Sequence, residues 1–326
     1  MIKIALCLFI IILGLILSNC FSDAPRDNPL DPQNSPQTHS LSGSVHTYYP
    51  HPPRSIIVNS KIILQPGDRI TYSNSDGDFF YNNLPAGAYT TFCETNNFLA
   101  DSIQVSLPEQ ATIEFFLDGL PHFENIELHS HIISHWPPVE DLYYIELNVT
   151  ASDTDGVEDL DLLWFEVAAI GVSDTLERTG SPGLFNLKRQ QDILSLHQFI
   201  GQEFQLFLQD KFGAVVRSDN HYIARIIDQT AILIFPVLAD TLASPIELSW
   251  QTVYLPFEFT LAIEITLINT FGIPVLMDRI TGIPANASSY LYSQNLDAGL
   301  YYWTLEIIDE FGNSSRSNEG TFVIRP

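Results

Sequence analysis

Residues 71–89 read TYSNSDGDFFYNNLPAGAY, and this stretch decides the fold of the N-terminal part of the chain. The run Asn74-Ser75-Asp76-Gly77-Asp78 places oxygen-bearing side chains around a glycine, as a calcium loop or an acidic site would. An EF-hand loop counted from Asn74 would need a glutamate at its twelfth position, which is Pro85. Asp and Asn hydrogen-bond their own backbone and Gly accepts positive φ, so Ser-Asp-Gly between two alternating runs predicts a hairpin turn. We therefore expect Phe79 and Tyr81 to face the core and Phe80 to face away from it.

The same stretch resembles the hallmark of carboxypeptidase regulatory-like domains. It has a threonine-bearing strand, an Asp-Gly turn, an aromatic strand and then Leu-Pro-x-Gly-x-Tyr from Leu84 to Tyr89. Upstream, Gly43-Ser-Val45 and the strand around residues 62–64 fit the same pattern, so the resemblance covers residues 41–119. Domains of that family are non-catalytic β-sandwich appendages, so the resemblance implies a structural first module and no peptidase activity.

Short alternating runs bounded by Gly, Pro, Asn and Asp continue from Leu41 to the end of the chain, which predicts an all-β protein. In the first module we expect Cys93 to be a small buried core residue rather than a nucleophile. Seven strands are predicted there, a number typical of a sandwich, over residues 41–47, 56–65, 69–73, 78–82, 87–94, 101–107 and 111–117.

An internal repeat extends this architecture to the rest of the chain. Asp210-Lys-Phe-Gly-Ala-Val-Val-Arg-Ser recurs as Asp309-Glu-Phe-Gly-Asn-Ser-Ser-Arg-Ser at an offset of 99 residues, and Ile145-Glu-Leu matches Ile246-Glu-Leu at 101. A period close to 100 residues is that of one immunoglobulin-sized sandwich. The repeat therefore predicts two related modules after the first one.

The last module resembles a fibronectin type III or immunoglobulin-like domain. Trp250 lies in an early strand, and Leu296-Asp-Ala-Gly-Leu-Tyr301 precedes a long alternating strand. In such sandwiches a tyrosine at this place makes a corner hydrogen bond, which the resemblance predicts for Tyr301. These residues are structural in that family, so the resemblance transfers no functional site.

The N-terminus has the pattern of a secretory signal. Lys3 precedes an apolar run from Ile4 to Leu17, which is short for a bilayer span of about 20 residues. Leu17-Ser-Asn-Cys20 resembles the lipobox of bacterial lipoprotein signal peptides, in which the cysteine becomes the lipidated first residue. Asn19 departs from the usual small residue at that position, and an uncleaved anchor is the alternative.

Residues 21–40 are rich in Pro, Asp, Asn and Ser and have few large apolar groups, so they are predicted to be an extended tether. The expected organisation is three β-sandwich domains in series behind this tether. The predicted segments are a signal peptide (1–19), a lipidated tether (20–40), a carboxypeptidase regulatory-like sandwich (41–120), an immunoglobulin-like sandwich (121–228) and an immunoglobulin or fibronectin type III-like sandwich (229–326).

Two short patterns are candidates for metal binding, although the favoured prediction is that no metal or other cofactor is bound. Asp153, Asp155 and Glu158 belong to an acidic run that forms either a weak calcium site or a solvated turn; its twelfth position is Trp164 rather than Glu. His129 and His131 alternate on a predicted strand and would form a zinc site only with further ligands such as Glu127.

Composition and motifs limit the function. The chain has 14 basic and 39 acidic residues, so clustered cationic contacts to nucleic acid are not expected. The sequence contains no nucleophile elbow, zinc-peptidase motif or phosphate loop, so no catalytic residues are predicted.

We expect a lipoprotein of the bacterial cell envelope, held in the membrane by acyl chains on Cys20, with the outer membrane as its expected location. Its predicted role is a non-enzymatic scaffold or binding module. A carbohydrate- or peptide-recognition protein and a calcium-dependent adhesin remain alternatives.

Overall fold

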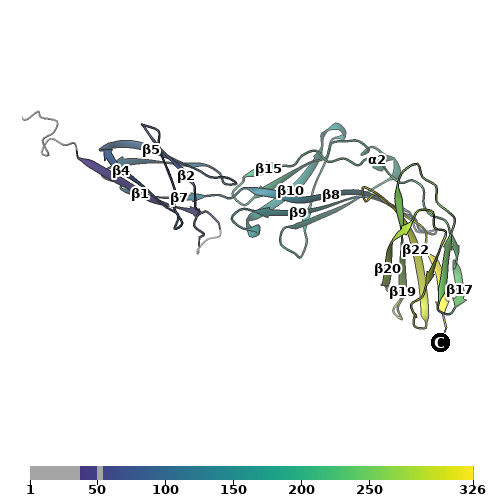
Figure 1. The fold of residues 1–326 in the computed structure, drawn as a ribbon. Helices are drawn as coiled ribbons and strands as arrows, with labels where there is room; N and C mark the ends of the chain where they lie inside the picture. The colour runs from purple at the N-terminus through teal and green to yellow at the C-terminus, as the bar shows by residue number, and fades with distance from the viewer. Residues whose placement is uncertain (1–36, 50–53, 326) are drawn as a thin grey trace, which may run out of the picture. The chain divides into compact units, whose positions relative to one another are not determined.

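The computed structural model describes residues 37–49 and 54–325, which form two compact units (Figure 1). The first unit contains residues 37–46, 56–96 and 100–117, and the second contains residues 47–49, 54–55, 97–99 and 118–325. Both units are built of β-strands, which confirms the predicted all-β class. Among the described residues, no helix combines the length and the apolar composition that crossing a membrane requires.

Seven strands build the first unit: β1 (Thr38–Thr47), β2 (Lys61–Gln65), β3 (Arg69–Tyr72), β4 (Asp78–Pro85), β5 (Gly87–Glu94), β6 (Asp101–Leu107) and β7 (Thr112–Leu117). They form a three-stranded sheet of order β4-β1-β7 and a four-stranded sheet of order β3-β2-β5-β6. The seven predicted strands are therefore confirmed, except that the second begins at Lys61 rather than at residue 56.

Side chains alternate between the core and the surface along β4, as predicted. Phe79 and Tyr81 are buried, whereas Phe80 is 51% exposed. The Tyr81 hydroxyl donates to the carbonyl of Ile62 at 2.7 Å, which ties β4 to the opposite sheet. Cys93 is fully buried, and burial raises the pKa of its thiol to about 12, so it is a core residue, as predicted.

The turn at residues 74–78 is tight, but the hairpin prediction is wrong. Asn74 Oδ1 accepts the N–H groups of Asp76 and Asp78 at 2.8 and 2.9 Å, and Gly77 has a φ of 79°. However, β3 pairs with β2 and β4 pairs with β1, so the turn joins strands of opposite sheets. Local turn chemistry is the same in both cases, so the sequence alone does not distinguish a hairpin from an arch between sheets.

The second unit contains the remaining elements: β8 (Pro121–Ile133), β9 (Leu142–Asp153), η2 (Val157–Asp159), β10 (Leu160–Val167), η3 (Ala168–Ile170), β11 (Val172–Thr175), β12 (Glu177–Arg178), β13 (Leu184–Gln191), α2 (Ile193–His197), β14 (Gln205–Asp210), β15 (Val215–Arg217), β16 (Leu233–Phe235), β17 (Leu238–Leu242), β18 (Ile246–Trp250), β19 (Phe259–Ile268), β20 (Pro274–Pro284), β21 (Ser289–Tyr292), β22 (Gly299–Asp309), β23 (Ser314–Arg316) and β24 (Gly320–Ile324).

Two separate hydrophobic cores lie inside the second unit. The buried residues of one core lie in the segment from Ile132 to Ile226, and those of the other lie in the segment from Ile227 to Ile324. The change of core falls close to the predicted boundary between residues 228 and 229. The division into three domains remains a prediction, because both cores belong to one compact unit.

A ten-stranded sheet runs through both cores. Its main path is β12-β13-β9-β8-β23-β22-β19-β20, and β24 and β17 extend it from β22. The long strands β8 and β9 pair side by side (Figure 1). The sheet passes from one core to the other where β23 pairs with β8 in parallel. Smaller sheets complete each sandwich, with orders β11-β10-β14-β15 and β16-β18-β21.

The 99-residue repeat has the same register in both copies. Phe207 is opposite Arg217 in the β14–β15 pair, and Glu306 is opposite Arg316 in the β22–β23 pair. In each copy a serine hydroxyl, of Ser218 or of Ser317, accepts the N–H group of a buried leucine at 3.1 or 3.0 Å. The repeat therefore identifies two copies of one structural element.

The two aromatic landmarks of the last module are structural, as predicted. Trp250 is 1% exposed, and its ring lies 6.3 Å from that of Trp303. The Tyr301 hydroxyl donates to the carbonyl of Asp297 at 2.9 Å, which confirms the predicted corner hydrogen bond.

Candidate metal centre

Three aspartates of one loop converge at the start of the second unit. Asp153 ends β9, and the chain then turns so that η2 places Asp159 directly before β10. The turn is held from within, because the N–H group of Asp155 donates to Asp153 Oδ1 at 3.2 Å. Ser, Thr, Asn and Asp favour such local side-chain to backbone bonds, which is why this sequence leaves the strand here.

Two further aspartates reach the same place from distant parts of the sequence. Asp118 directly follows β7 in the chain and belongs to the second unit, where its carbonyl accepts the N–H group of Leu99 at 2.8 Å. Asp210 ends β14, and its Oδ1 accepts three consecutive N–H groups of the following turn at 2.7–2.9 Å. We call the five residues Asp118, Asp153, Asp155, Asp159 and Asp210 the acidic cluster.

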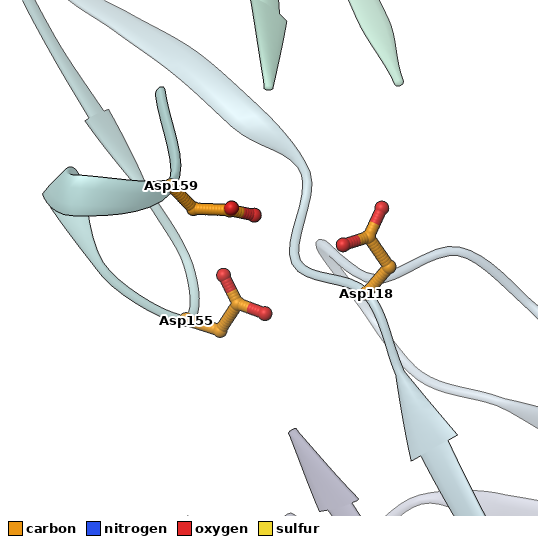
Figure 2. Close-up of side chains that lie close together, drawn as sticks. All are labelled: Asp118, Asp155 and Asp159. Carbon is orange, nitrogen blue, oxygen red and sulfur yellow. The ribbon is translucent and has the colours of Figure 1, made fainter. Parts of the chain in front are cut away.

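The carboxylates of the acidic cluster form two overlapping groups. Asp118, Asp155 and Asp159 each offer an oxygen to the first group, and Figure 2 shows their side chains around a common space. Asp153, Asp159 and Asp210 form the second group. Within each group the three oxygens all lie within 4.8 Å of one another, and Asp159 belongs to both.

Most of these carboxylates are inaccessible to solvent. Asp159 and Asp210 are fully buried, and Asp153 is 8% exposed. Both oxygens of Asp118 and of Asp159 are buried without a hydrogen-bond partner, as is one oxygen of each of the other three. A buried polar atom without a partner carries a substantial desolvation cost, and buried polar groups in native proteins are almost always satisfied.

The negative charge of the cluster is not neutralised by side chains in the part of the chain that the structure describes. No ion pair there involves any of the five aspartates. Lys211 is adjacent, but its ammonium donates to the carbonyl of Glu158 and lies 5.1 Å from the ring centroid of Tyr49. The cluster is therefore a compact group of acids without an ion-pair partner among the described side chains.

Burial and mutual repulsion raise the pKa values of these acids. Burial, followed by the charges of Asp210, Asp155 and Asp159, raises the pKa of Asp118 to about 7. Burial and then Asp155 raise the pKa of Asp159 to about 6. The pKa of Asp153 is also raised, first by burial and then by its contact with Asp155. Both effects disfavour the charged form of a carboxyl group.

Backbone packing around the cluster is tight at Gly119. A Cβ atom at this position would lie 2.7 Å from Asp153 Oδ1 and 2.7 Å from the N atom of Asp155. The N–H groups of Gly119 and of Tyr49 both donate to Asp155 Oδ2 at 3.2 Å. A glycine is needed here because the backbone passes directly over the acidic loop.

The predicted calcium candidates are brought together only in part. Asp153 and Asp155 belong to the acidic cluster, whereas Glu158 is exposed and its carboxylate belongs to neither group. Asp118, Asp159 and Asp210 were missed by sequence reasoning. Asp159 stands in the same acidic run and Asp210 opens the repeat, so the sequence held a signal that could have identified both as site residues. Nothing in the sequence points to Asp118.

The predicted zinc candidates lie on β8 in a different environment. His131 Nδ1 is 2.8 Å from Ser314 Oγ, and its Nε2 is 3.2 Å from Glu146 Oε2. The His129 ring lies against Gly312, and burial, followed by the charge of His131, lowers the pKa of His129. Among the described residues, neither histidine belongs to a group of three potential metal ligands. Cys20, the predicted lipidation site, lies outside the described residues.

Comparisons with known proteins identify no family for this chain. No protein-family model matches it, and no curated protein matches it. Among solved structures, the major pilin subunit BcpA of Bacillus cereus matches at 7% identity over 89% of this chain and 98% of that one, with a TM-score of 0.29.

Two other solved structures match comparably. The FN1–FN3 domains of chicken CNTN1 match at 9% identity over 84% of this chain and 93% of that one, with a TM-score of 0.32. A putative carbohydrate binding protein from Bacteroides uniformis matches at 11% identity over 57% of this chain and 98% of that one, with a TM-score of 0.23. At such TM-scores no argument about the function of this chain rests on these matches.

Proposed function

We propose that the protein is a lipid-anchored protein of the bacterial cell envelope whose β-sandwiches act as a non-enzymatic scaffold or binding module. The observation that carries this proposal is the sheet that runs through both cores of the second unit. Two sandwiches that share a sheet form one support, meaning a single continuous structure, rather than two domains joined by a flexible linker. Separating them would break backbone hydrogen bonds.

Side chains at the passage from β8 to β23 strengthen this support. The N–H group and the hydroxyl of Ser130 both donate to Asn313 Oδ1 at 3.0 Å, and both residues are 1% exposed. Arg225 donates through two nitrogens to Glu310 at 2.9 and 3.1 Å, and its guanidinium lies 4.3 Å from the ring centroid of Phe257. The Ser130–Asn313 pair is buried, and buried, paired polar groups fix one geometry between packed elements; the Arg225–Glu310 pair is partly exposed.

Buried groups that could perform chemistry are used for structure in this protein. Asp309 is 6% exposed, and its Oδ1 accepts the N–H groups of Phe311 and Asn313 at 2.9 Å each. Burial keeps the thiol of Cys93 protonated, and a protonated, buried thiol is a poor nucleophile. These assignments support a role without catalysis.

Attachment to the membrane is the part of the proposal that rests on Cys20. A chain carrying more than one acyl group is held stably in a bilayer, so acylated Cys20 would anchor the sandwiches through the tether. The test is metabolic labelling with palmitate in a bacterium that processes lipoproteins. We expect labelled wild-type protein in the membrane fraction and unlabelled Cys20→Ala protein outside it. Labelling that survives the substitution would contradict the anchor.

A second candidate function, recognition of a carbohydrate or an apolar peptide, is favoured by one surface pocket. The pocket has a volume of about 380 Å³ and is lined by Trp136, Ile232, Leu238 and Glu319, among others. Trp136 is 56% exposed, and its indole N–H group donates to the carbonyl of Glu319 at 2.7 Å, which fixes the ring. An exposed, oriented indole ring is a suitable stacking surface for a sugar or an apolar side chain.

A glycan array and a peptide library probed with wild-type protein and Trp136→Ala test this second candidate. Binding that is lost in the variant, at an unchanged melting temperature, would support recognition at this pocket. Identical binding profiles of the two proteins would exclude it.

A further inference from the structure

The acidic cluster leaves buried carboxylate oxygens that the chain itself does not satisfy. Asp159 is the clearest case, because it is fully buried and neither of its oxygens accepts a hydrogen bond. It is also the residue shared by the two groups of oxygens. A side chain in this position either stays neutral or has a cation beside it, since an isolated buried charge is highly unfavourable.

The repeat supplies an internal comparison, because Asp309 occupies the place of Asp210 in the other copy. Asp309 Oδ2 accepts the side-chain N–H of Asn313 at 3.1 Å and lies 3.8 Å from a guanidinium nitrogen of Arg225. Asp210 Oδ2 has no partner, and the residue in the place of Asn313 is Ala214. Beside Asp309 the chain provides a neutralising cation, Arg225, and beside Asp210 it provides further carboxylates.

The donor set matches a hard divalent cation. All ligand atoms of both groups are carboxylate oxygens, which suit Ca²⁺ and Mg²⁺ rather than zinc or copper. Two oxygens bound to one Ca²⁺ at about 2.3–2.6 Å are at most about 5 Å apart, so each group is compact enough for a single ion. Ca²⁺ accepts many protein oxygens in irregular geometry, whereas Mg²⁺ usually keeps several waters and uses one or two carboxylates.

We propose that the acidic cluster is a Ca²⁺ site centred on Asp159. The bound ion takes the role beside Asp210 that Arg225 has beside Asp309. The site goes beyond the scaffold function and does not depend on the anchor at Cys20, so the two proposals fail or stand separately.

The test is the melting temperature of the full-length purified protein, stripped with a chelator and then measured in chelator, Ca²⁺ or Mg²⁺. Calorimetric titration with Ca²⁺ supplies the Kd. A ligand that binds only the folded state stabilises it in proportion to the logarithm of its concentration. At a Ca²⁺ concentration about 100-fold above the Kd, we expect the melting temperature of the second unit to rise by about 5–10 °C.

Asp159→Asn is the decisive variant, because it keeps the volume of the side chain and removes its charge. We expect Ca²⁺ to leave its melting temperature unchanged, and its melting temperature in chelator to equal or exceed that of the wild type, since one repelling charge is gone. Asp161→Asn is the matched control: it removes the same charge two residues along the chain from an exposed position, and it should keep the Ca²⁺ response. If Asp159→Asn melts below the wild type in chelator, Asp118→Asn provides the same comparison.

Three results would overturn the proposal. The first is a wild-type melting temperature that Ca²⁺ does not change. The second is a full Ca²⁺ response in both Asp159→Asn and Asp118→Asn. The third is an equal response to Mg²⁺ at the same concentration, which would contradict the choice of Ca²⁺.

Discussion

At the scale of single residues, Glu146 illustrates how a charge is accommodated when partners are present. It lies on β9 with its side chain 16% exposed, and its two oxygens lie 3.2 Å from His131 Nε2 and from Lys188 Nζ. These partners, His131 first, outweigh burial and lower the pKa of Glu146 to about 2. The contrast with the acidic cluster is direct, because there the neighbours are other acids.

This lowered pKa predicts a pH-dependent contribution to stability. The pKa is about 2 in the folded state and about 4.5 in the unfolded state, so the contribution is complete above pH 4.5 and is lost as the pH falls towards 2. Glu146→Gln should therefore lower the free energy of unfolding by about 3 kcal/mol at pH 7 and by almost nothing near pH 2.

Urea unfolding of wild type and variant across this pH range checks the prediction. Glu247→Gln is the matched control, because Glu247 occupies the same place in the other copy of the repeat and is exposed. A Glu146→Gln effect that stays constant from pH 7 to pH 2 would show that the carboxylate contributes through packing rather than through charge.

Gly77 is the residue on which the arch between the two sheets of the first unit depends. Its φ of 79° disfavours any side chain, and an added Cβ would lie 3.0 Å from the carbonyl oxygen of Val45. Gly77→Ala should destabilise the first unit by about 1–2 kcal/mol. Gly67→Ala is the control, because Gly67 also has a positive φ but open space around it. Equal melting temperatures for the two variants would remove the steric part of this explanation.

At the scale of elements, the sequence predicted those features that depend on residues close together in the chain. Alternation fixed the burial of Phe79 and Tyr81, and the corner bond of Tyr301 spans only four residues. The hairpin at Gly77 was predicted wrongly because the same turn chemistry serves strands of one sheet or of two. Asp118 was missed for a related reason: its partners lie in a loop after β9, and only the folded topology brings them together.

The pairing of β8 with β23 was also invisible in the sequence, although all of β23 lies in the repeat. Asn313 occupies the place of Ala214, and of the two copies only the later one has a strand, β23, that pairs with β8. Asn313→Ala thus introduces the residue that the sister copy already tolerates. It would remove the acceptor of the Ser130 N–H group and the hydrogen bond to Asp309 Oδ2, at a cost of about 2–3 kcal/mol.

Scanning calorimetry of Asn313→Ala checks this prediction at the level of the two cores. We expect the transitions of the two cores to separate, with the core after Ile227 melting at a lower temperature than in the wild type. A single unchanged transition would mean that Asn313 does not couple the two sandwiches.

At the scale of the whole molecule, the formal net charge of −25 gives the chain an acidic surface. Arg225 pairs with Glu310 and lies 5.0 Å from the ring centroid of Phe311. The central claim is that the shared sheet joins the two cores of the second unit into one support.

Hydrogen exchange on the full-length protein, read for peptides that cover β8 and β23, tests this claim most directly. The N–H group of Ser134 donates to the carbonyl of Arg316, and that of Ser130 donates to Asn313. We predict that both amides exchange as slowly as those in the middle of β9 and β22, because they open only when the shared sheet opens. Exchange at the rate of the exposed turn at residues 180–182 would contradict the claim that the two cores form one support.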